Sequence, residues 1–304
     1  MKSSVAIATY NGAKFILKLL SSIKDQTRKA DEVIICDDGS KDDTVALIET
    51  FIKDNSLNNW KLCKNDKNLG YAENYRKAFS LTTGDIIFPC DQDDIWVIDR
   101  LEKMMSVMEQ NKDIGLLNTD YAEFSSDKPD ILKNYYIFDE TRITKIRLNA
   151  KNRFLQYPGC VMAIRKSFLS NIEKYWFKSW AHDEFLWCVA ISLNQCYYYR
   201  YCSLKRRCHE EQTSGHLAHT VDSRVSYLEG ELKSAETLLN VLRLEQMDTK
   251  KAVRLYKKNL KTTKLRLDLV KNKRLRNIFI LPFYLKYYYS KKSYLIEIKI
   301  ALKG

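Results

Sequence analysis

The sequence lacks the segments and spacings that mark membrane-spanning, disulfide-stapled and zinc-binding proteins. No apolar run in its 304 residues reaches the roughly 20 residues that a membrane-spanning helix needs. Its eight cysteines include no Cys-x-x-Cys pair and lie mostly in apolar segments, which favours buried free thiols in a reducing cytosol. The spacing of Cys202, Cys208 and His209 argues against a zinc site. Residues 1–4 lead directly into an apolar strand pattern, so we expect no signal peptide.

Internal repeats and low-complexity linkers are also absent, and acidic residues become scarce towards the C-terminus. The composition, 45% hydrophobic and 29% charged, predicts a globular protein with a sizeable core. Residues 231–304 hold 19 Lys and Arg against 6 Asp and Glu, whereas the first 230 residues hold 32 of each kind. The net charge of +13 therefore belongs to the C-terminal segment. Such a segment suggests a polyanionic partner, either a membrane surface or nucleic acid.

Segments with strand and helix patterns alternate through the first 120 residues. This alternation predicts an α/β fold whose mostly parallel central sheet carries helices on both faces. From Asp222 the pattern changes to basic amphipathic helices, so we predict a domain at 1–220 and a helical C-terminal extension at 221–304. The predicted strands are 5–8, 33–36, 60–63, 85–89, 114–119, 159–164 and 196–201; the predicted helices are 15–23, 45–52, 71–81, 97–111, 183–193, 225–242 and 252–267; a polar loop is predicted at 205–216.

Three polar motifs directly follow predicted strands: ATYNG at 8–12, CDDGS at 36–40 and CDQDD at 90–94. In parallel sheets ligands bind at the carboxyl ends of the strands, so we expect the three motifs to share one binding edge. Asp91, Asp93 and Asp94 crowd within four positions, and like charges so close raise one another's pKa. Capping the following helix would need only Asp94. The cluster therefore favours a bound cation over a turn that points into water.

Six motifs in order resemble those of family 2 glycosyltransferases with a GT-A fold, over about residues 3–217. Besides the three motifs above, they are NLGYAENY at 68–75, HDEFLW at 182–187 and RCHEEQTSG at 207–215. The set is most similar to bacterial rhamnosyltransferase-type members. The family's processive Q-x-x-R-W motif is absent from the sequence. The resemblance therefore implies an enzyme that adds one sugar, and not a polymer synthase.

The resemblance implies a site for Mg²⁺ or Mn²⁺. Hard cations prefer carboxylate oxygens, and a cation neutralises the charge that develops on a departing diphosphate. By the resemblance, Asp93 is the direct metal ligand, and Asp91 contacts the ribose or lies just outside the ligand sphere. His209 matches a further metal ligand of the family, with a solvated loop histidine as the alternative.

The resemblance also implies a nucleotide site at the ends of the first strands. Asp38 matches the residue that recognises the base through its ring N–H, with a plain Asp-Gly turn as the alternative. Thr9 and Asn11 match residues that border the nucleotide, and Asn68 belongs to the N-x-G segment, which a turn explains nearly as well. Arg207, with the arginine before it, would clamp the diphosphate, unless the two belong to a solvated basic loop.

Asp183 is the expected general base. An inverting transfer needs a carboxylate within hydrogen-bond reach of the attacking hydroxyl while the anomeric carbon passes through an oxocarbenium-like state. Glu184 is the alternative base if the register differs by one residue, and a helix N-terminus also favours acids. Cys160 is expected either near the acceptor or in the core.

The residues and the resemblance together predict a metal-dependent, inverting glycosyltransferase for polysaccharide biosynthesis. It would move one sugar, with dTDP-rhamnose as the leading donor and UDP-hexoses as the alternative, to a lipid-linked or surface-polysaccharide acceptor. A nucleotidyltransferase of related fold would need a Gly-rich basic loop after the first strand to bind a triphosphate, and ATYNG is not such a loop. The basic tail motivates a nucleic-acid-binding protein, but its aromatics cluster with aliphatic residues, so we expect no nucleic-acid partner.

The C-terminal segment 271–304 predicts attachment to an anionic membrane surface. Its apolar run at 278–285 is too short to span a bilayer and is interrupted by Pro282. Tyrosines favour the membrane–water boundary, and lysines favour anionic headgroups. The protein is therefore expected in the cytoplasm, at the inner face of the cell membrane. Alternatively, the C-terminal helices pack on the catalytic domain or on a second subunit in a homodimer.

Overall fold

The computed structural model describes all residues except 126–127, 134–141, 209–219, 248 and 304. The chain divides into two compact units. The first comprises residues 1–146, 157–187 and 195–211, and the second comprises residues 147–156, 188–194 and 212–304. The second unit thus includes two short segments from the middle of the chain. The predicted domain boundary after residue 220 lies inside this unit and stays a prediction.

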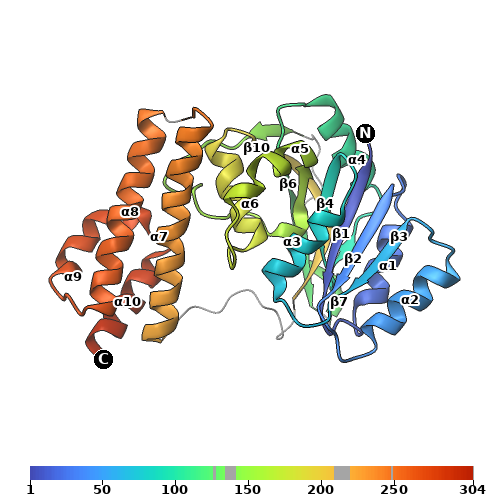
Figure 1. Ribbon diagram of the computed structural model, residues 1–304, viewed down its shortest axis with the longest axis horizontal. Helices are drawn as coiled ribbons and strands as arrows, with labels where there is room; N and C mark the ends of the chain where they lie inside the picture. The colour runs from blue at the N-terminus through green and yellow to red at the C-terminus, as the bar shows by residue number, and fades with distance from the viewer. Residues whose placement is uncertain (126–127, 134–141, 209–219, 248, 304) are drawn as a thin grey trace. The chain divides into compact units, whose positions relative to one another are not determined.

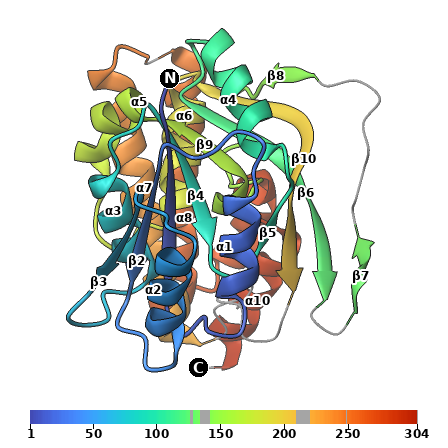
Figure 2. The ribbon, with the colours of Figure 1, turned by 90° about the vertical axis from the view of Figure 1, so that its right-hand side faces the viewer.

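A mixed, mostly parallel sheet forms the centre of the first unit (Figures 1 and 2). Its strand order is β3-β2-β1-β4-β9-β6-β10-β5, with β7 beside β6 and β8 beside β10. The first four of these strands run parallel to one another, as do β6 and β10, whereas β9 is antiparallel to both of its neighbours. The strands are β1 (Ser3–Thr9), β2 (Glu32–Asp37), β3 (Trp60–Lys64), β4 (Ile86–Asp91), β5 (Ile95–Trp96), β6 (Leu116–Ser125), β7 (Lys128–Lys133), β8 (Ile143–Lys145), β9 (Met162–Arg165) and β10 (Cys196–Cys208).

Helices cover both faces of this sheet, as Figure 1 shows for α1 and α2 on one side of β1 and α3 on the other. Side chains alternate along a strand, so Val5 and Ile7 pack with the apolar residues of α1, α2 and α4. The α/β fold with a mostly parallel sheet is therefore confirmed. The helices are α1 (Ile16–Lys24), α2 (Thr44–Asp54), α3 (Tyr71–Leu81), α4 (Arg100–Gln110), α5 (Lys166–Ile172) and α6 (His182–Ser192), with short 3₁₀ turns at Gly159–Val161 and Glu173–Tyr175.

Strand β10 corrects the prediction of a polar loop from Lys205. The strand continues to Cys208 and stays paired with β6, with Arg207 opposite Phe124. Pairing of backbone groups with those of β6 continues the strand. The basic side chains have the composition of a polar loop, although Arg207 is only 4% exposed. Likewise, α4 begins at Arg100 and not at residue 97, because Ile95–Trp96 pairs with β10 as strand β5.

The second unit is mainly helical. Its helices are α7 (Val221–Leu244), α8 (Lys250–Lys271), α9 (Asn277–Ile280) and α10 (Lys291–Lys303), with a 3₁₀ helix, η3, at Leu281–Tyr287. The amphipathic helices predicted at 225–242 and 252–267 are confirmed. Apolar side chains of α7, α8 and α10 meet at Leu228, Val270 and Ile300. Within the described ranges, no helix combines the length and the apolar character that crossing a bilayer requires.

A buried ionic cluster joins three of these helices. Glu297 of α10 is fully buried, and its Oε1 accepts hydrogen bonds from Arg224 Nη2 at 2.6 Å and Arg266 Nη2 at 2.9 Å. Arg266 Nη1 also donates to Glu231 Oε2 at 2.5 Å. Each buried charge thus has a partner of opposite sign, as burial in an apolar interior requires.

Candidate active site

The three polar motifs at the strand ends meet at one edge of the sheet. In the parallel register, Thr9 of β1 lies opposite Asp37 of β2, and Ala8 lies opposite Asp91 of β4. The loops that follow these strands therefore leave the sheet side by side. This is the edge where ligands bind in open α/β sheets.

Gln92 ties the loop after β4 to the loop after β1. Its Oε1 accepts from the backbone N of Tyr10 at 2.9 Å, and its Nε2 donates to the Tyr10 carbonyl at 3.0 Å. A Cβ on Gly12 would lie 2.3 Å from the same Oε1, so this close approach requires glycine. Gln92 was not predicted as a site residue, since its position between two aspartates is the only signal in the sequence.

Asp37 organises the turn after β2. Its Oδ1 accepts from the backbone N of Gly39 at 3.1 Å and of Ser40 at 2.9 Å, and its Oδ2 accepts from Thr9 Oγ1 at 3.0 Å. Ser40 Oγ in turn accepts from the backbone N of Asn11 at 2.8 Å. The predicted residues Thr9 and Asn11 thus belong to one hydrogen-bonded frame around the end of β1.

Asp38 holds the segment that leads into α3. The residue is 2% exposed, and its Oδ1 accepts from the backbone N of Leu69 at 2.8 Å while its Oδ2 accepts from that of Gly70 at 2.9 Å. Asn65 Nδ2 donates to Oδ1 as well, at 2.8 Å. The exposed Asn68 accepts from Gly70 N at 3.0 Å. The structure thus gives Asp38 a loop-holding role, and its recognition of a base stays a prediction.

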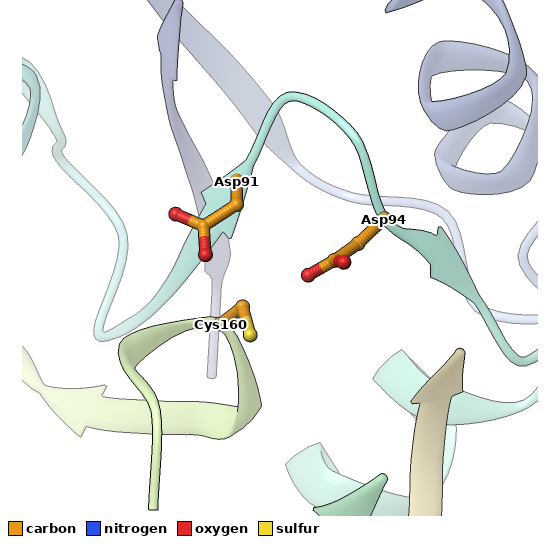
Figure 3. Close-up of side chains that lie close together, drawn as sticks. All are labelled: Asp91, Asp94 and Cys160. Carbon is orange, nitrogen blue, oxygen red and sulfur yellow. The ribbon is translucent and has the colours of Figure 1, made fainter. Parts of the chain in front are cut away.

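An acidic cluster lies at the end of β4 and faces the 3₁₀ turn at Gly159–Val161. Figure 3 shows the carboxylates of Asp91 and Asp94 and the thiol of Cys160 turned towards one another, and their potential ligand atoms lie within 4.8 Å. Burial raises the pKa of Asp94 well above its usual range, and Asp93 and Asp91 raise it further. Burial and Asp93 also raise the pKa of Asp91, against the hydrogen bond from Tyr75 Oη at 2.5 Å. The half-buried carboxylate of Asp91 and the buried carboxylate of Asp94, so close together, need a proton or a cation between them.

The chemistry of this cluster fits a hard divalent cation on the carboxylates. Asp91 and Asp94 supply the oxygen atoms that Mg²⁺ and Mn²⁺ prefer. Burial raises the pKa of the Cys160 thiol well above its usual range, so this sulfur stays protonated and is a poor ligand for such an ion. Asp94 thus joins Asp91 in this cluster, while direct ligation by Asp93 stays a prediction; the predicted ligand His209 lies outside the described residues.

Arg207 holds the backbone of the acidic loop. Its backbone N donates to Asp94 Oδ1 at 3.1 Å, and its Nε donates to the carbonyl of Asp93 at 2.9 Å. The guanidinium lies over the rings of Phe15 and Phe124, at 4.8 and 4.5 Å from their centroids. Because the residue is on a strand and not in an open loop, it is placed to position the aspartates. A direct contact with a diphosphate stays a prediction.

His182 and Asp183 approach the acidic cluster from the N-terminus of α6. The buried His182 ring stacks on Tyr75 with 3.8 Å between centroids, and burial lowers its pKa. A Cβ on Gly159 would lie 2.2 Å from His182 Nε2, so only glycine allows this contact. Asp183 is half-buried, and its Oδ1 accepts from the backbone N of Glu184 at 2.8 Å. A Cβ on Gly159, the residue before Cys160, would lie 3.2 Å from Asp183 Cβ, so the expected base lies beside the turn that faces the cluster.

A family model covers the four motifs at 8–12, 36–40, 68–75 and 90–94. Residues 4–172, more than half of the chain, match the model described as Glycosyl transferase family 2. The chain belongs to glycosyl transferase family 2. An uncharacterized glycosyltransferase of Nostoc sp. is 24% identical over 63% of this chain and 60% of its own length. An Escherichia coli protein, UDP-Glc:alpha-D-GlcNAc-diphosphoundecaprenol beta-1,3-glucosyltransferase WfaP, is 36% identical over 36% of this chain and 42% of its own.

Solved structures of low sequence identity share the fold of this family 2 member. S. aureus TarS, solved as residues 1–349 with UDP-GlcNAc, gives a TM-score of 0.64 at 19% identity, covering 98% of this chain and 82% of that one. The mannosyltransferase PcManGT from Pyrobaculum calidifontis, solved with GDP-Man and Mn²⁺, gives 0.53 at 15% identity, covering 99% and 84%. The predicted GT-A fold is therefore confirmed. The chain spans less than two thirds of the length of its curated relatives from Nostoc sp. and E. coli.

Buried Arg100 supports the turn that faces the aspartates in this glycosyltransferase-family chain. Its Nη2 donates to the carbonyl of Cys160 at 2.6 Å, and its guanidinium lies 4.1 Å from the centroid of the Trp96 ring. Arg100, Gln92, Tyr75 and His182 were all missed as site residues by sequence reasoning. Gln92, Tyr75 and His182 each lie in one of the six motifs, which is their only signal in the sequence, whereas Arg100 lies in none.

Proposed function

We propose that this chain transfers one sugar from a nucleoside-diphosphate donor to an acceptor hydroxyl, with inversion at the anomeric carbon. The observation that carries the proposal is the convergence of Asp91 and Asp94 at the carboxyl edge of the sheet, beside Asp183. The family match supports sugar transfer as the reaction class.

Asp91 and Asp94 would hold a divalent cation, Mg²⁺ or Mn²⁺, with Asp93 as the alternative second ligand. Such an ion, when bound, neutralises charge on the diphosphate. The chain's own contribution is to fix the aspartates: Tyr75 orients Asp91, while Arg207 donates to the carbonyl of Asp93 and to the carboxylate of Asp94. The mannosyltransferase PcManGT, which shares the fold and was solved with Mn²⁺, supports this choice of metal.

Asp183 would accept the proton of the attacking hydroxyl. It lies in the first turn of α6, and its Cβ would be 3.2 Å from a Cβ on Gly159, next to Cys160 of the cluster, so a general base and a leaving-group site would be adjacent. The nucleotide would occupy the edge bordered by Thr9, Asn11, Asp38 and Asn68. A single addition, and not polymerisation, fits the missing Q-x-x-R-W motif.

The donor is a hexose nucleotide in this proposal. The names of similar proteins favour UDP-Glc and UDP-GlcNAc, whereas the motif resemblance favours dTDP-rhamnose. The acceptor would be a lipid-linked saccharide, as the name of the E. coli relative states for that protein. Such an acceptor would make attachment of residues 271–304 to the inner face of the cell membrane useful.

Hydrolysis of a panel of sugar nucleotides tests the proposal. The protein is incubated with UDP-Glc, UDP-GlcNAc, GDP-Man and dTDP-rhamnose, with Mn²⁺ or with chelator, and released nucleoside diphosphate is measured. We expect slow metal-dependent release from one donor, and loss of that release in Asp91→Asn. Absence of release from every donor, also with lipid-linked acceptors added, would contradict the proposal. Release that chelator leaves unchanged would contradict the metal.

A further inference from the structure

Large apolar side chains are exposed together on one segment of the second unit. Phe279 is 79% exposed and Phe283 is 83% exposed, and Leu275 and Ile280 beside them are also exposed. The opposite face of this segment is covered, because Leu281 is fully buried in an apolar cluster with Leu269 of α8. Two phenylalanines four residues apart with most of their surface in water require a partner, since proteins rarely leave such a patch uncovered.

A basic stripe runs along the exposed face of α8. Lys250, Lys251, Arg254, Lys257, Lys261 and Lys264 are all exposed and recur at helical spacing. Within the described part of the chain, none of these six has a carboxylate within 4.0 Å, whereas Lys271 and Arg274 pair with Glu229 and Asp268. No acidic residue interrupts the sequence from Lys250 to Leu267. As far as the described residues go, the stripe therefore presents uncompensated positive charge.

The apolar segment and the basic stripe belong to one surface. Asn277 of α9 donates from Nδ2 to the carbonyl of Leu265 in α8 at 2.9 Å, and Figure 1 shows α9 beside α8. Lys261 Nζ lies 5.7 Å from the centroid of the Tyr284 ring in η3. The same lysine lines a shallow hollow of about 560 Å³ with Arg254, Lys257 and other residues of α8. Lys261 therefore joins the hollow on α8 to the segment that carries Phe283.

We propose that this surface docks on an anionic lipid bilayer, with Phe279 and Phe283 inserted at the interface and the α8 lysines against the headgroups. The proposal rests on the proposed function, because a lipid-linked acceptor is the reason for docking at a membrane. It places the main contact with anionic headgroups on α8, whereas the sequence predicted this contact for residues 271–304. An apolar ridge beside a basic stripe is the pattern of a helix that lies in the interface plane. Anionic lipid supplies the negative charge that the described residues do not provide to the stripe.

The charge of the surface argues against a second copy as its occupant. A twofold contact places the same patch of both subunits together, so the lysines of α8 would face lysines. Such like-charge contacts are unfavourable. Nucleic acid would neutralise the charge of the lysines. It would not cover the apolar surface that Phe279 and Phe283 form with Leu275 and Ile280.

Vesicle binding by the full-length chain tests the proposal. Vesicles of phosphatidylcholine, with and without phosphatidylglycerol, are sedimented with the unchanged protein and with two double variants. Phe279→Ser with Phe283→Ser should weaken binding to the anionic vesicles on the order of 10²-fold, because two aromatic side chains no longer enter the apolar layer. Lys257→Gln with Lys261→Gln should weaken it about 25-fold, since each charge contributes about fivefold near such a surface. Added salt should weaken binding of the unchanged protein.

Matched controls use exposed residues of the same kind elsewhere. Leu295→Ser with Leu302→Ser changes two apolar side chains of α10 that are each 63% exposed, and Lys53→Gln with Lys61→Gln removes two exposed charges from the first unit. Both controls should bind the anionic vesicles as the unchanged protein does. Equal loss in the controls and the test variants would overturn the assignment of this surface.

Three further results would overturn the proposal. The first is that phosphatidylglycerol does not increase vesicle binding of the unchanged protein at low salt. The second is that the phenylalanine variant halves the mass in analytical ultracentrifugation, which would make the occupant a second copy. The third is that an RNA oligonucleotide binds and the lysine variant loses it while vesicle binding is unaffected. Sugar-nucleotide hydrolysis is measured on the same samples, so failure of the docking surface and failure of the transferase activity are separate results.

Discussion

Substitution of Gly159 by alanine tests the packing beside the acidic cluster. The new Cβ would lie 2.2 Å from His182 Nε2 and 3.2 Å from Asp183 Cβ, so either the His182 ring or the turn at Gly159–Val161 must move. The ring is buried and stacked on Tyr75, which leaves it little room. Overpacking of this kind costs about 1–3 kcal/mol in the free energy of unfolding. A shift near 1 Å at Asp183 or Cys160 should lower turnover by about 10²-fold.

Gly230 provides the matched control for this substitution. It lies inside α7, and a Cβ there would meet no atom within 4 Å. Gly230→Ala should therefore raise the free energy of unfolding by about 0.5–1 kcal/mol and leave turnover unchanged. Urea unfolding and donor hydrolysis are measured on both variants.

A second variant separates steric conflict from other effects of the new methyl group. His182→Ala removes the ring that the methyl group would meet and leaves the milder 3.2 Å approach to Asp183 Cβ, so adding Gly159→Ala to that variant should cost much less stability than it costs in the unchanged protein. If Gly159→Ala keeps full turnover and unfolds within about 0.5 kcal/mol of the unchanged protein, the close contact between Gly159 and His182 does not exist in solution.

Three further perturbations address the base, a pH-dependent contact and the buried ionic cluster. Asp183→Asn should lower turnover by about 10²–10⁴-fold while donor binding is kept. If Asp183→Asn is active and Glu184→Gln is inactive, the general base is Glu184 and not Asp183. Burial would raise the pKa of Asp99, but hydrogen bonds from Lys103 and Tyr201 outweigh it and lower that pKa. Asp99 therefore adds stability above its unfolded pKa that is lost as pH falls through the folded pKa. The destabilisation by Asp99→Asn should be full at neutral pH in urea unfolding and shrink below about pH 4; an equal effect at both pH values would refute the charged contact. Glu297→Gln should cost about 3–5 kcal/mol because Arg224 and Arg266 lose their buried counter-charge, and an effect as small as that of the exposed Glu236→Gln would refute this role.

Local patterns in the sequence predict the fold and the edge that carries the site. Apolar strands alternate with amphipathic helices, and the carboxyl ends of parallel strands share an edge, so ATYNG, CDDGS and CDQDD could be brought together from the sequence alone. The C-terminal helices followed from their apolar spacing in the same way.

Contacts between distant segments could not be predicted from such patterns. The approach of His182 to Gly159 and the bridge from Gln92 to Tyr10 depend on how loops pack, and no periodicity encodes them. The basic residues of β10 led to the prediction of a loop where the structure has a strand. Arg207 is buried there by contacts with the acidic loop and with two aromatic rings, and these contacts come from distant segments. Asp94 was counted in the acidic cluster, with a helix cap as the alternative, but its place beside Cys160 could not be predicted, since that segment is 66 positions away in the sequence.

The most direct measurement of the central claim is calorimetric binding of the nucleoside diphosphate whose sugar conjugate is hydrolysed. The unchanged protein, Asp91→Asn, Asp94→Asn and the exposed control Asp54→Asn are titrated with and without Mn²⁺. We predict metal-dependent binding that Asp54→Asn retains and that Asp91→Asn and Asp94→Asn weaken by about 10²-fold or more, because the charge compensation at the diphosphate is lost. Binding of equal strength in all four proteins, or binding that does not need the metal, would contradict the assignment of Asp91 and Asp94 as the donor site.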